Sequence, residues 1–427
     1  MQKRQFIKSL SLLGMSGFIG SASISQIIKE YEHVPLNELA GDEDFWEKVR
    51  KGYRIKTDYI NLENGYYCFL PQETLEKYLE HIREVNFQGS YYMRTVQFDN
   101  KKKMAAQLAV IAGCQEEELI ITRNTTESLD TVIGGFQWKE GDEAVMAEQD
   151  YGAMLDMFTL MQRRYGIVNK RISLPNHPAS DQEIVDLYAA AITPRTKLLM
   201  VCHMVNITGQ ILPIRKICDM AHSKGVKVMV DGAHAFAHIQ FSVKDLDCDY
   251  YGASLHKWLS VPLGAGILYI KKDRIQDIWP LLADSDSRKP DDIYRLNHVG
   301  THPVATDLTI MDAIDFYRKI GPARKEARLR YLQQYWTSKV RQLPNIVVNT
   351  PKDPTRSCAI ANVGVKTMKP AQLAETLLKK YRIYTVAIDY ANVQGCRITP
   401  NIYTTTSDLD HLVKALTELN DSSKLNT

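Results

Sequence analysis

Short apolar runs alternate with amphipathic stretches along most of the chain. The runs are rich in β-branched residues and have strand length: 59–62, 119–121, 143–146, 197–201, 227–231 and 264–270. Most are separated by segments whose apolar residues recur with helical spacing. Strands that alternate with helices predict a mostly parallel sheet covered by helices, so the pattern indicates an α/β fold.

The pattern changes in the last third of the chain. A long helical stretch covers residues 312–343 and is interrupted at Gly321-Pro322, where proline restarts a helix. Strand-like segments and two helices follow it: strands at 358–363, 384–388 and 397–399, and helices at 370–380 and 407–419. This arrangement predicts a smaller α+β domain.

These patterns divide the chain into five parts. We expect a leader at 1–26, an N-terminal segment at 27–60 that packs with the small domain, a large domain at 61–310, a small C-terminal domain at 311–420 and a loose polar tail at 421–427.

Charge and composition argue against a nucleic-acid-binding protein. The formal net charge of +3 comes from 53 basic and 50 acidic residues. The first 28 residues carry Lys3, Arg4 and Lys8 and no acid, so the rest of the chain balances at 50 − 50 = 0. A hydrophobic content of 44% is that of a globular protein. The body of the protein is therefore not predicted to bind nucleic acid.

The leader has the layout of an export signal. A basic start is followed by a weakly apolar run rich in Gly and Ser and by the small residues Ser21-Ala22-Ser23. The segment Lys3-Arg4-Gln5-Phe6-Ile7-Lys8 resembles the twin-arginine export motif, with Lys3 in place of the first arginine. We expect a periplasmic or exported bacterial protein that engages the export machinery. The alternatives are a disordered or amphipathic N-terminal arm and, if the leader is not functional, a cytoplasmic protein.

The cysteines do not indicate a metal or disulfide framework. There are seven, and none forms a C-x-x-C pair. We predict no metal site.

One pair of residues points to a specific cofactor. Asp231 ends an apolar strand and is followed by Gly232, and Lys257 lies 26 residues later in Ser254-Leu255-His256-Lys257-Trp258, just before a glycine-rich strand. Pyridoxal 5'-phosphate (PLP) needs a lysine that forms a Schiff base and an acidic partner that keeps the pyridine nitrogen protonated. A strand-end aspartate alone is more often a helix cap, and a lone lysine is usually a surface charge. Together, in this order, they predict PLP.

With these motifs the chain resembles the class V aminotransferase family of PLP enzymes, which includes cysteine desulfurases and isopenicillin N epimerase-like proteins. The resemblance runs from about Tyr59 to Leu419. It implies a fold-type I architecture, an amino-acid substrate and a homodimer with shared active sites. Lys257 would be the catalytic Schiff-base lysine and Asp231 the partner of the pyridine nitrogen.

The resemblance also assigns roles to further residues. Thr125 and Thr126 would bind the cofactor phosphate at a helix start, although a plain N-cap is the alternative. The other implied cofactor contacts are Tyr151 stacked on the ring, Asn206 and His234 near it, Ser254 and His256 at the phosphate, and Thr301 lent to the neighbouring subunit's phosphate. Arg397 would grip the substrate carboxylate.

Three remaining assignments are weaker. His203 is a second candidate near the ring, although a core histidine is the alternative there. His238 is expected to be a core histidine. Residues 89–94 resemble a substrate-side stretch of the epimerase-like branch.

The reaction stays open at this stage. Transamination, epimerisation and elimination share one carbanion at Cα. Desulfuration is disfavoured, because no cysteine lies between Tyr384 and Gly395 and Cys396 is expected on the opposite strand face from Arg397. We therefore expect an aminotransferase or an epimerase-like enzyme. The alternatives are a C–S lyase or cysteine desulfurase-like enzyme and a non-catalytic protein with the same fold.

Overall fold

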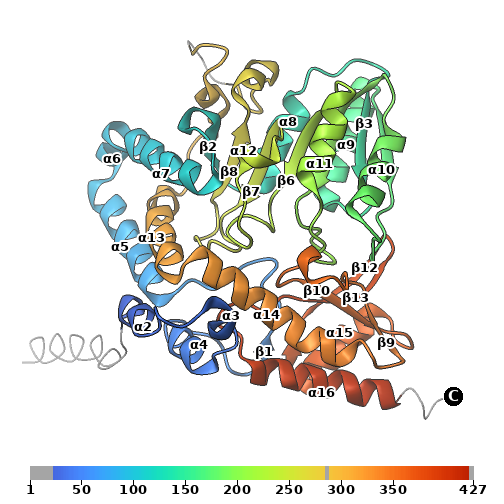
Figure 1. The fold of residues 1–427 in the computed structure, drawn as a ribbon. Coiled ribbons are helices and arrows are strands. Elements are labelled where there is room, and N and C mark those ends of the chain that lie inside the picture. Colours follow the sequence, from blue (N-terminus) through green and yellow to red (C-terminus); the bar gives the residue numbers. More distant parts are fainter. Residues whose placement is uncertain (1–22, 284–287, 423–427) are drawn as a thin grey trace, which may run out of the picture.

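A seven-stranded sheet forms the centre of the large domain. The computed structural model describes residues 23–283 and 288–422 (Figure 1). The strand order is β2-β8-β7-β6-β5-β3-β4. The bounds are β2 Leu119–Thr122, β3 Glu143–Ala147, β4 Val168–Ile172, β5 Thr196–Cys202, β6 Lys227–Asp231, β7 Tyr250–Ser254 and β8 Gly266–Ile270. Only β8 runs antiparallel to its neighbours in this sheet.

Helices connect and cover these strands. They are α7 Gln97–Ala112, α8 Thr125–Gly135, α9 Gly152–Tyr165, α10 Asp181–Ala191, α11 Ile214–Ser223 and α12 Val243–Leu246. Short 3-10 turns occur at Glu116–Glu118, Lys272–Asp277, Ile293–Leu296 and Pro354–Arg356. The prediction of a mostly parallel α/β sheet is confirmed.

Two strands of this sheet were not predicted. β4 is an edge strand whose residues are exposed or half-buried, so it lacks a clear apolar run. β7 is fully buried, but its sequence Tyr250-Tyr251-Gly252-Ala253-Ser254 is short and contains few β-branched residues. Both strands are identified by their hydrogen-bonded pairing with neighbouring strands and not by a sequence pattern.

The small domain is built on a four-stranded antiparallel sheet of order β12-β13-β10-β9. Its strands are β9 Ile346–Val348, β10 Ala361–Val365, β12 Val386–Tyr390 and β13 Val393–Ile398. Helices α15 Pro370–Tyr381 and α16 Thr406–Ser422 pack against it, together with α14 Pro322–Val340. Both predicted C-terminal helices are therefore present. Residues 423–427 of the predicted tail lie outside the described residues.

The break between the domains lies at Gly321. Helix α13 Val304–Ile320 packs on α5 Gln72–Gln88 and α7, and so belongs with the large domain. Gly321 has a φ of 89°, and Pro322 starts α14 at its first position. The predicted boundary at 310/311 therefore falls inside α13, while the interruption at Gly321-Pro322 is confirmed.

The N-terminal segment joins the two domains. It contains α2 Ile24–Glu30, α3 Leu36–Leu39, α4 Glu43–Arg50 and β1 Ile60–Asn61, and α6 Ser90–Thr95 follows α5. β1 pairs in parallel with β11 Ile383–Tyr384 of the small domain, and Arg50 forms an ion pair with Asp408 at 2.9 Å. Residues 24–26, assigned to the leader above, form the start of α2, and residues 1–22 lie outside the described part.

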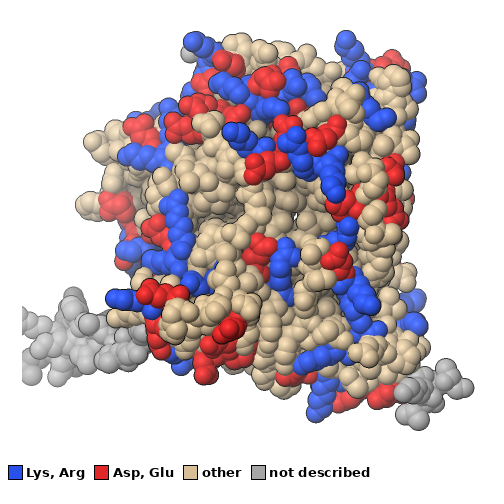
Figure 2. Space-filling model, viewed as in Figure 1, with Lys and Arg blue, Asp and Glu red and all other residues tan. Residues whose placement is uncertain are grey.

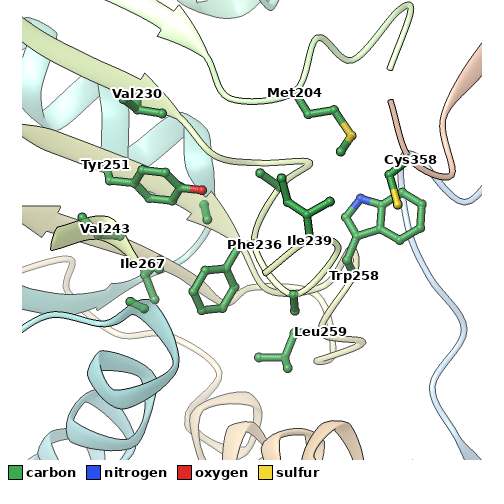
Figure 3. Packing of buried hydrophobic residues seen from close by; sticks show 14 of the residues in the cluster. Met204, Val230, Phe236, Ile239, Val243, Tyr251, Trp258, Leu259, Ile267 and Cys358 are labelled. Carbon is green, nitrogen blue, oxygen red and sulfur yellow. The ribbon is translucent and has the colours of Figure 1, made fainter. Parts of the chain in front are cut away.

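The core and surface are those of a globular protein. A large apolar cluster runs from α2 and α4 through the central sheet, and Figure 3 shows part of it. Lys and Arg are interspersed with Asp and Glu over the face shown in Figure 2. Within residues 23–283 and 288–422, no helix combines the length and the apolar content that crossing a bilayer requires.

Candidate active site

A cavity of about 360 Å³ lies at the carboxyl ends of β5, β6 and β7. This is the edge where open parallel sheets bind ligands. The start of α8 forms one wall, and Arg397 of β13 and Gly65 close it from the small-domain side. Most of the predicted residues line it: Thr125, Thr126, Tyr151, Asn206, Asp231, His234, Ser254, His256, Lys257 and Arg397.

Lys257 lies just after β7, in the turn that leads to β8. Its Nζ is 3.0 Å from Nε2 of His234. Burial lowers the pKa of Lys257 to about 8, although Asp231 acts in the opposite direction. A lysine with this pKa is neutral in a substantial fraction near pH 7 to 8, and only the neutral amine attacks a carbonyl group.

Asp231 ends β6 inside the cavity and is 5% exposed. Its Oδ1 accepts a hydrogen bond from the backbone N–H of Ala233 at 2.9 Å. Burial raises the pKa of Asp231, while that N–H and Lys257 oppose the rise. A buried carboxylate of this kind is stabilised most by a cationic group placed against it.

The start of α8 is held against the end of β7. The side chain of Asn124 caps the helix by accepting from the N–H of Glu127 at 2.9 Å. The Thr125 N–H and hydroxyl both contact Oγ of Ser254, at 2.9 and 2.7 Å. Gly266 of β8 passes so close to the backbone of Asn124 that a Cβ would lie 2.7 Å from its Cα. The helix N-terminus therefore faces the cavity, where it favours an anion.

Two buried polar atoms of the cavity have no hydrogen-bond partner within residues 23–283 and 288–422. They are Nδ1 of His256 and Oδ1 of Asn206. Burial lowers the pKa of His256 to about 4, so its imidazole is neutral at pH 7. Tyr151 directly precedes α9, lines the cavity and is 47% exposed. Unpaired polar atoms, a helix N-terminus and a carboxylate suit a ligand with polar, anionic and cationic groups, and PLP has all three.

Arg397 enters the cavity already paired. Its Nη2 and Nε lie 2.6 and 3.3 Å from the two carboxylate oxygens of Glu63, and its Nη1 donates to the backbone oxygen of Asn206 at 3.3 Å. Gly65 packs on the guanidinium, since a Cβ there would lie 2.6 Å from Cζ. A guanidinium has five N–H donors, so one on Nη1 and one on Nη2 remain for another carboxylate.

The two other candidate histidines lie outside the cavity. His203 is buried beside Tyr251, with Nδ1 3.3 Å from its hydroxyl, and burial lowers its pKa to about 3. His238 contacts the backbone oxygen of His234 through Nδ1 and accepts from the N–H of Ala359 through Nε2. Both are core histidines in the structure, as expected for His238.

Thr301 lies away from Lys257 within the same chain. It lines a separate cavity of about 460 Å³, together with Met93, Lys101 and His302. Met93 belongs to the 89–94 stretch, which therefore borders Thr301 rather than the Lys257 cavity. A role of Thr301 at the neighbouring subunit's phosphate stays a prediction.

Comparison with known proteins assigns the family. The family model for aminotransferase class-V matches residues 69–412. The chain belongs to the class-V aminotransferase family. It is similar to the isopenicillin N epimerase of Streptomyces clavuligerus, with 26% identity over 88% of this chain and 98% of the relative. It is 30% identical to the isopenicillin N epimerase of Amycolatopsis lactamdurans over 73% of this chain and 83% of the relative.

Solved structures share the fold. The apo structure of a cysteine desulfurase from Thermococcus onnurineus NA1 superposes with a TM-score of 0.78 at 20% identity, covering 88% of this class-V chain and 98% of the other. A C-DES variant with glycine linked covalently to its PLP cofactor gives a TM-score of 0.75 at 20% identity, covering 84% and 96%. The predicted family, the fold-type I architecture and PLP as the cofactor of this enzyme family are confirmed.

The sequence did not indicate two residues that contact the guanidinium of Arg397. Glu63 and Gly65 hold Arg397, but in the sequence Glu63-Asn64-Gly65 indicates only a turn. Their role can be recognised only in the folded structure, since Glu63 and Arg397 are 334 positions apart in the sequence. The described residues contain no group of three or more potential metal ligands.

Proposed function

We propose that this protein is a PLP-dependent enzyme that acts at Cα of an amino acid or an amino-acid-containing metabolite, as an isopenicillin N epimerase-like enzyme or an aminotransferase. One observation carries the proposal: Lys257, Asp231 and Arg397 line the same cavity. An amine, a buried carboxylate and a guanidinium are the groups that this chemistry needs, and they also argue against a non-catalytic protein.

Each group has a distinct task. PLP, when bound, supplies an electron sink for the electrons left at Cα. Asp231 would balance the cation on the ring nitrogen, and the start of α8 with Ser254 and His256 would hold the phosphate. Arg397 would bind the substrate carboxylate through the two N–H groups that Glu63 and Asn206 leave unused. Lys257 is the cavity's amine and would move the proton at Cα.

The structure offers little support for the desulfurase alternative. The segment upstream of Arg397 is a β-hairpin whose turn at Ala391 and Asn392 is fixed, since Asn392 accepts from Gln149 and donates to the Leu174 oxygen, both at 2.8 Å. That segment contains no cysteine. Cys396 donates to the Pro370 oxygen of α15, on the face opposite the cavity.

Cys202 is a cysteine that lines the cavity itself. Burial, with help from Asp150 and Asp231, raises its pKa well above that of an ordinary thiol. A thiol with a raised pKa is a poor nucleophile at neutral pH. A C–S lyase needs no cysteine nucleophile, so these cysteines do not bear on that alternative. An assay of the products must distinguish it from the epimerase and the aminotransferase.

The test combines a spectrum with product analysis. The purified protein with PLP should absorb above about 400 nm, and Lys257→Ala should abolish that band. Amino acids and short peptides supplied in D₂O should then show deuterium at Cα with inversion, or a keto acid. Release of sulfide from cysteine, or of cysteine persulfide from cystine, would favour the lyase instead. A wild-type protein that stays colourless with PLP would refute the enzyme proposal.

We also propose a homodimer in which Thr301 is lent to the partner's active site. Its support is the separation of Thr301 from the Lys257 cavity of its own chain. Light scattering should give twice 48.7 kDa. A mixture of Lys257→Ala and Thr301→Ala chains should form hybrid dimers with one intact site. A monomer that retains full activity would contradict this arrangement.

We propose export as well, with the leader as its signal. The basis is the sequence pattern of residues 1–26. Because Ser23 caps α2 and Ile24 is buried, removal of the leader before Ser23 would leave the packed body complete. Mass spectrometry of periplasmic protein should find an N-terminus near residue 23. Recovery of intact Met1 from the cytoplasm alone would count against export.

A further inference from the structure

Trp258 follows Lys257 directly and is completely buried, as one of the cluster side chains in Figure 3. Its indole Nε1–H donates to Nδ1 of His234 at 3.4 Å. The other ring nitrogen of His234, Nε2, is 3.0 Å from Nζ of Lys257. The imidazole therefore connects the indole with the amine that the proposed function uses.

Two further contacts fix Trp258. Its ring stacks on His238 at a centroid distance of 3.7 Å. Its backbone oxygen accepts from the buried Nζ of Lys325 on α14. His238 is held in turn by the His234 oxygen at 2.7 Å and the Ala359 N–H at 3.0 Å. The indole N–H therefore has a defined direction.

The hydrogen-bonding roles follow from the chemistry of the rings. An indole N–H only donates, so Nδ1 of His234 must accept. A neutral imidazole carries a single proton, which is then on Nε2. That Nε2–H points at Nζ of Lys257, and an amine accepts a hydrogen bond only in its neutral form.

The charges around His234 support its neutral state. It is buried, and burial lowers its pKa well below 6.5, with smaller contributions in the same direction from Lys257, Arg397, His238 and His256. The groups that act on Lys257 itself are Asp231, Cys68 and Glu63, which favour its cation, and Arg397, which disfavours it.

We infer that Trp258 is a positioning residue: its indole N–H fixes His234 as the tautomer protonated on Nε2, and this N–H stabilises Lys257 as the neutral amine. The inference rests on the proposed function in that Lys257 is taken to be the reactive amine. It also excludes His234 as a base toward Lys257, because its lone pair faces Trp258.

The first readout is the tautomer, measured without cofactor. Long-range ¹H–¹⁵N spectra of ¹⁵N-histidine-labelled apo-protein distinguish the two neutral forms, and loss of a signal in His234→Gln assigns the residue. His234 should be neutral with the proton on Nε2. Protonation on Nδ1 in the wild-type protein would overturn the inference, and this measurement requires no folded Trp258 variant.

The second readout is the reactivity of Lys257. Trp258→Phe keeps an aromatic ring but removes the donor, so Nε2 of His234 becomes free to accept from the lysine cation. Carbamylation of Lys257 by cyanate at pH 7, followed by mass spectrometry, should slow by a factor of about three to ten, which corresponds to a pKa higher by about half a unit to one unit. An unchanged rate and an unchanged tautomer would overturn the inference.

Two control variants distinguish an effect of the Trp258 N–H on the His234 tautomer from a general effect of Trp258 on packing. In His234→Leu no polar group links position 258 with Lys257, so adding Trp258→Phe should then change the Lys257 rate less than twofold. An equal loss in both backgrounds would show a packing role and overturn the inference. Trp138→Phe removes a buried indole N–H that bonds the Ile133 oxygen outside the cavity, and should leave Lys257 unaffected. Because all these readouts use apo-protein, they stand whether or not turnover is found.

Discussion

Arg397, the proposed substrate-binding side chain, is oriented by a residue that need not touch the substrate. Glu63 takes two of its donors and Asn206 a third. The remaining pair has a fixed direction, because the guanidinium is planar. The pair with Glu63 is buried, with side-chain exposures of 10% and 6%, so its geometry is not loosened by solvent.

Glu63→Gln should therefore weaken substrate binding. The amide cannot accept at both positions, so Arg397 loses one charge-assisted hydrogen bond worth about 1.5–3 kcal/mol and its fixed orientation. We expect KM to rise about tenfold or more, with a smaller change in kcat. Steady-state kinetics of the PLP-bound enzyme measure this split. Glu143→Gln removes a buried ion-paired carboxylate outside the cavity and serves as control, and equal KM values in both variants would refute the role.

Lys257 should give a clear pH dependence in the apo-protein. Burial lowers its pKa to about 8, and only the neutral amine combines with an aldehyde. The rate at which the protein captures PLP should rise about tenfold per pH unit below this value and level off above it. Stopped-flow absorbance above about 400 nm follows the capture. A plateau reached only near pH 10 would show an ordinary lysine.

The sequence was sufficient for the residues whose position depends on a local element. Asp231 ends a predicted strand, Lys257 precedes the predicted glycine-rich strand, and Thr125 starts a helix, so short segments place them in the crevice. It was insufficient for Glu63 and for the link between Trp258 and His234, because those contacts join segments that only the folded chain brings together. His203 shows the same limit, since adjacency to β5 did not reveal that its ring turns toward Tyr251.

At the level of elements, the carboxylate of Glu143 forms ion pairs that link β3 to the edge strand β4 and to Arg195. Glu143 at the start of β3 has a fully buried side chain and pairs with Lys170 of β4 at 2.7 Å and with Arg195 at 3.0 Å. Burial alone would raise its pKa, but hydrogen bonds from Lys170, Thr193 and Arg195 outweigh that effect and lower it to about 2.

This carboxylate predicts a loss of stability in acid. Its pKa is lower in the folded than in the unfolded protein, so its contribution is complete above the unfolded value of 4.5 and is lost as the pH falls toward 2. Urea unfolding between pH 6 and 3 should show a steeper decline for the wild type than for Glu143→Gln. Parallel curves for the two proteins would contradict this assignment.

The same edge explains why β4 escaped prediction. Its three central residues, Asn169, Lys170 and Arg171, are all polar, and none of its residues is fully buried, as is usual for an edge strand. By contrast, α13 and α14 were anticipated because Gly321-Pro322 is a strong local signal. The predicted boundary at 310/311, however, lies within α13, which starts at Val304 and packs against α5 and α7.

For the whole molecule, the N-terminal segment is part of the folded body. Ile24 and Ile27 are buried with α13, at 8% and 5% exposure. A chain that starts at Ser23 keeps these contacts and should unfold at the same temperature as the full chain. A chain that starts at Tyr31 loses about 3–5 kcal/mol of burial and should unfold a few degrees lower. Calorimetry compares the three proteins, and equal melting for all would show that α2 contributes nothing.

The pairing of β1 with β11 has a consequence for biosynthesis. Arg50 donates hydrogen bonds to the backbone oxygen of Tyr403 and to the carboxylate of Asp408, which lie 353 and 358 positions later in the chain. The Leu62 N–H donates to the backbone oxygen of Tyr384. A ribosome makes Arg50 early, but its partners emerge only when translation is almost complete. The segment from Arg50 to β1 therefore cannot complete its contacts until β11 and the start of α16 have been translated.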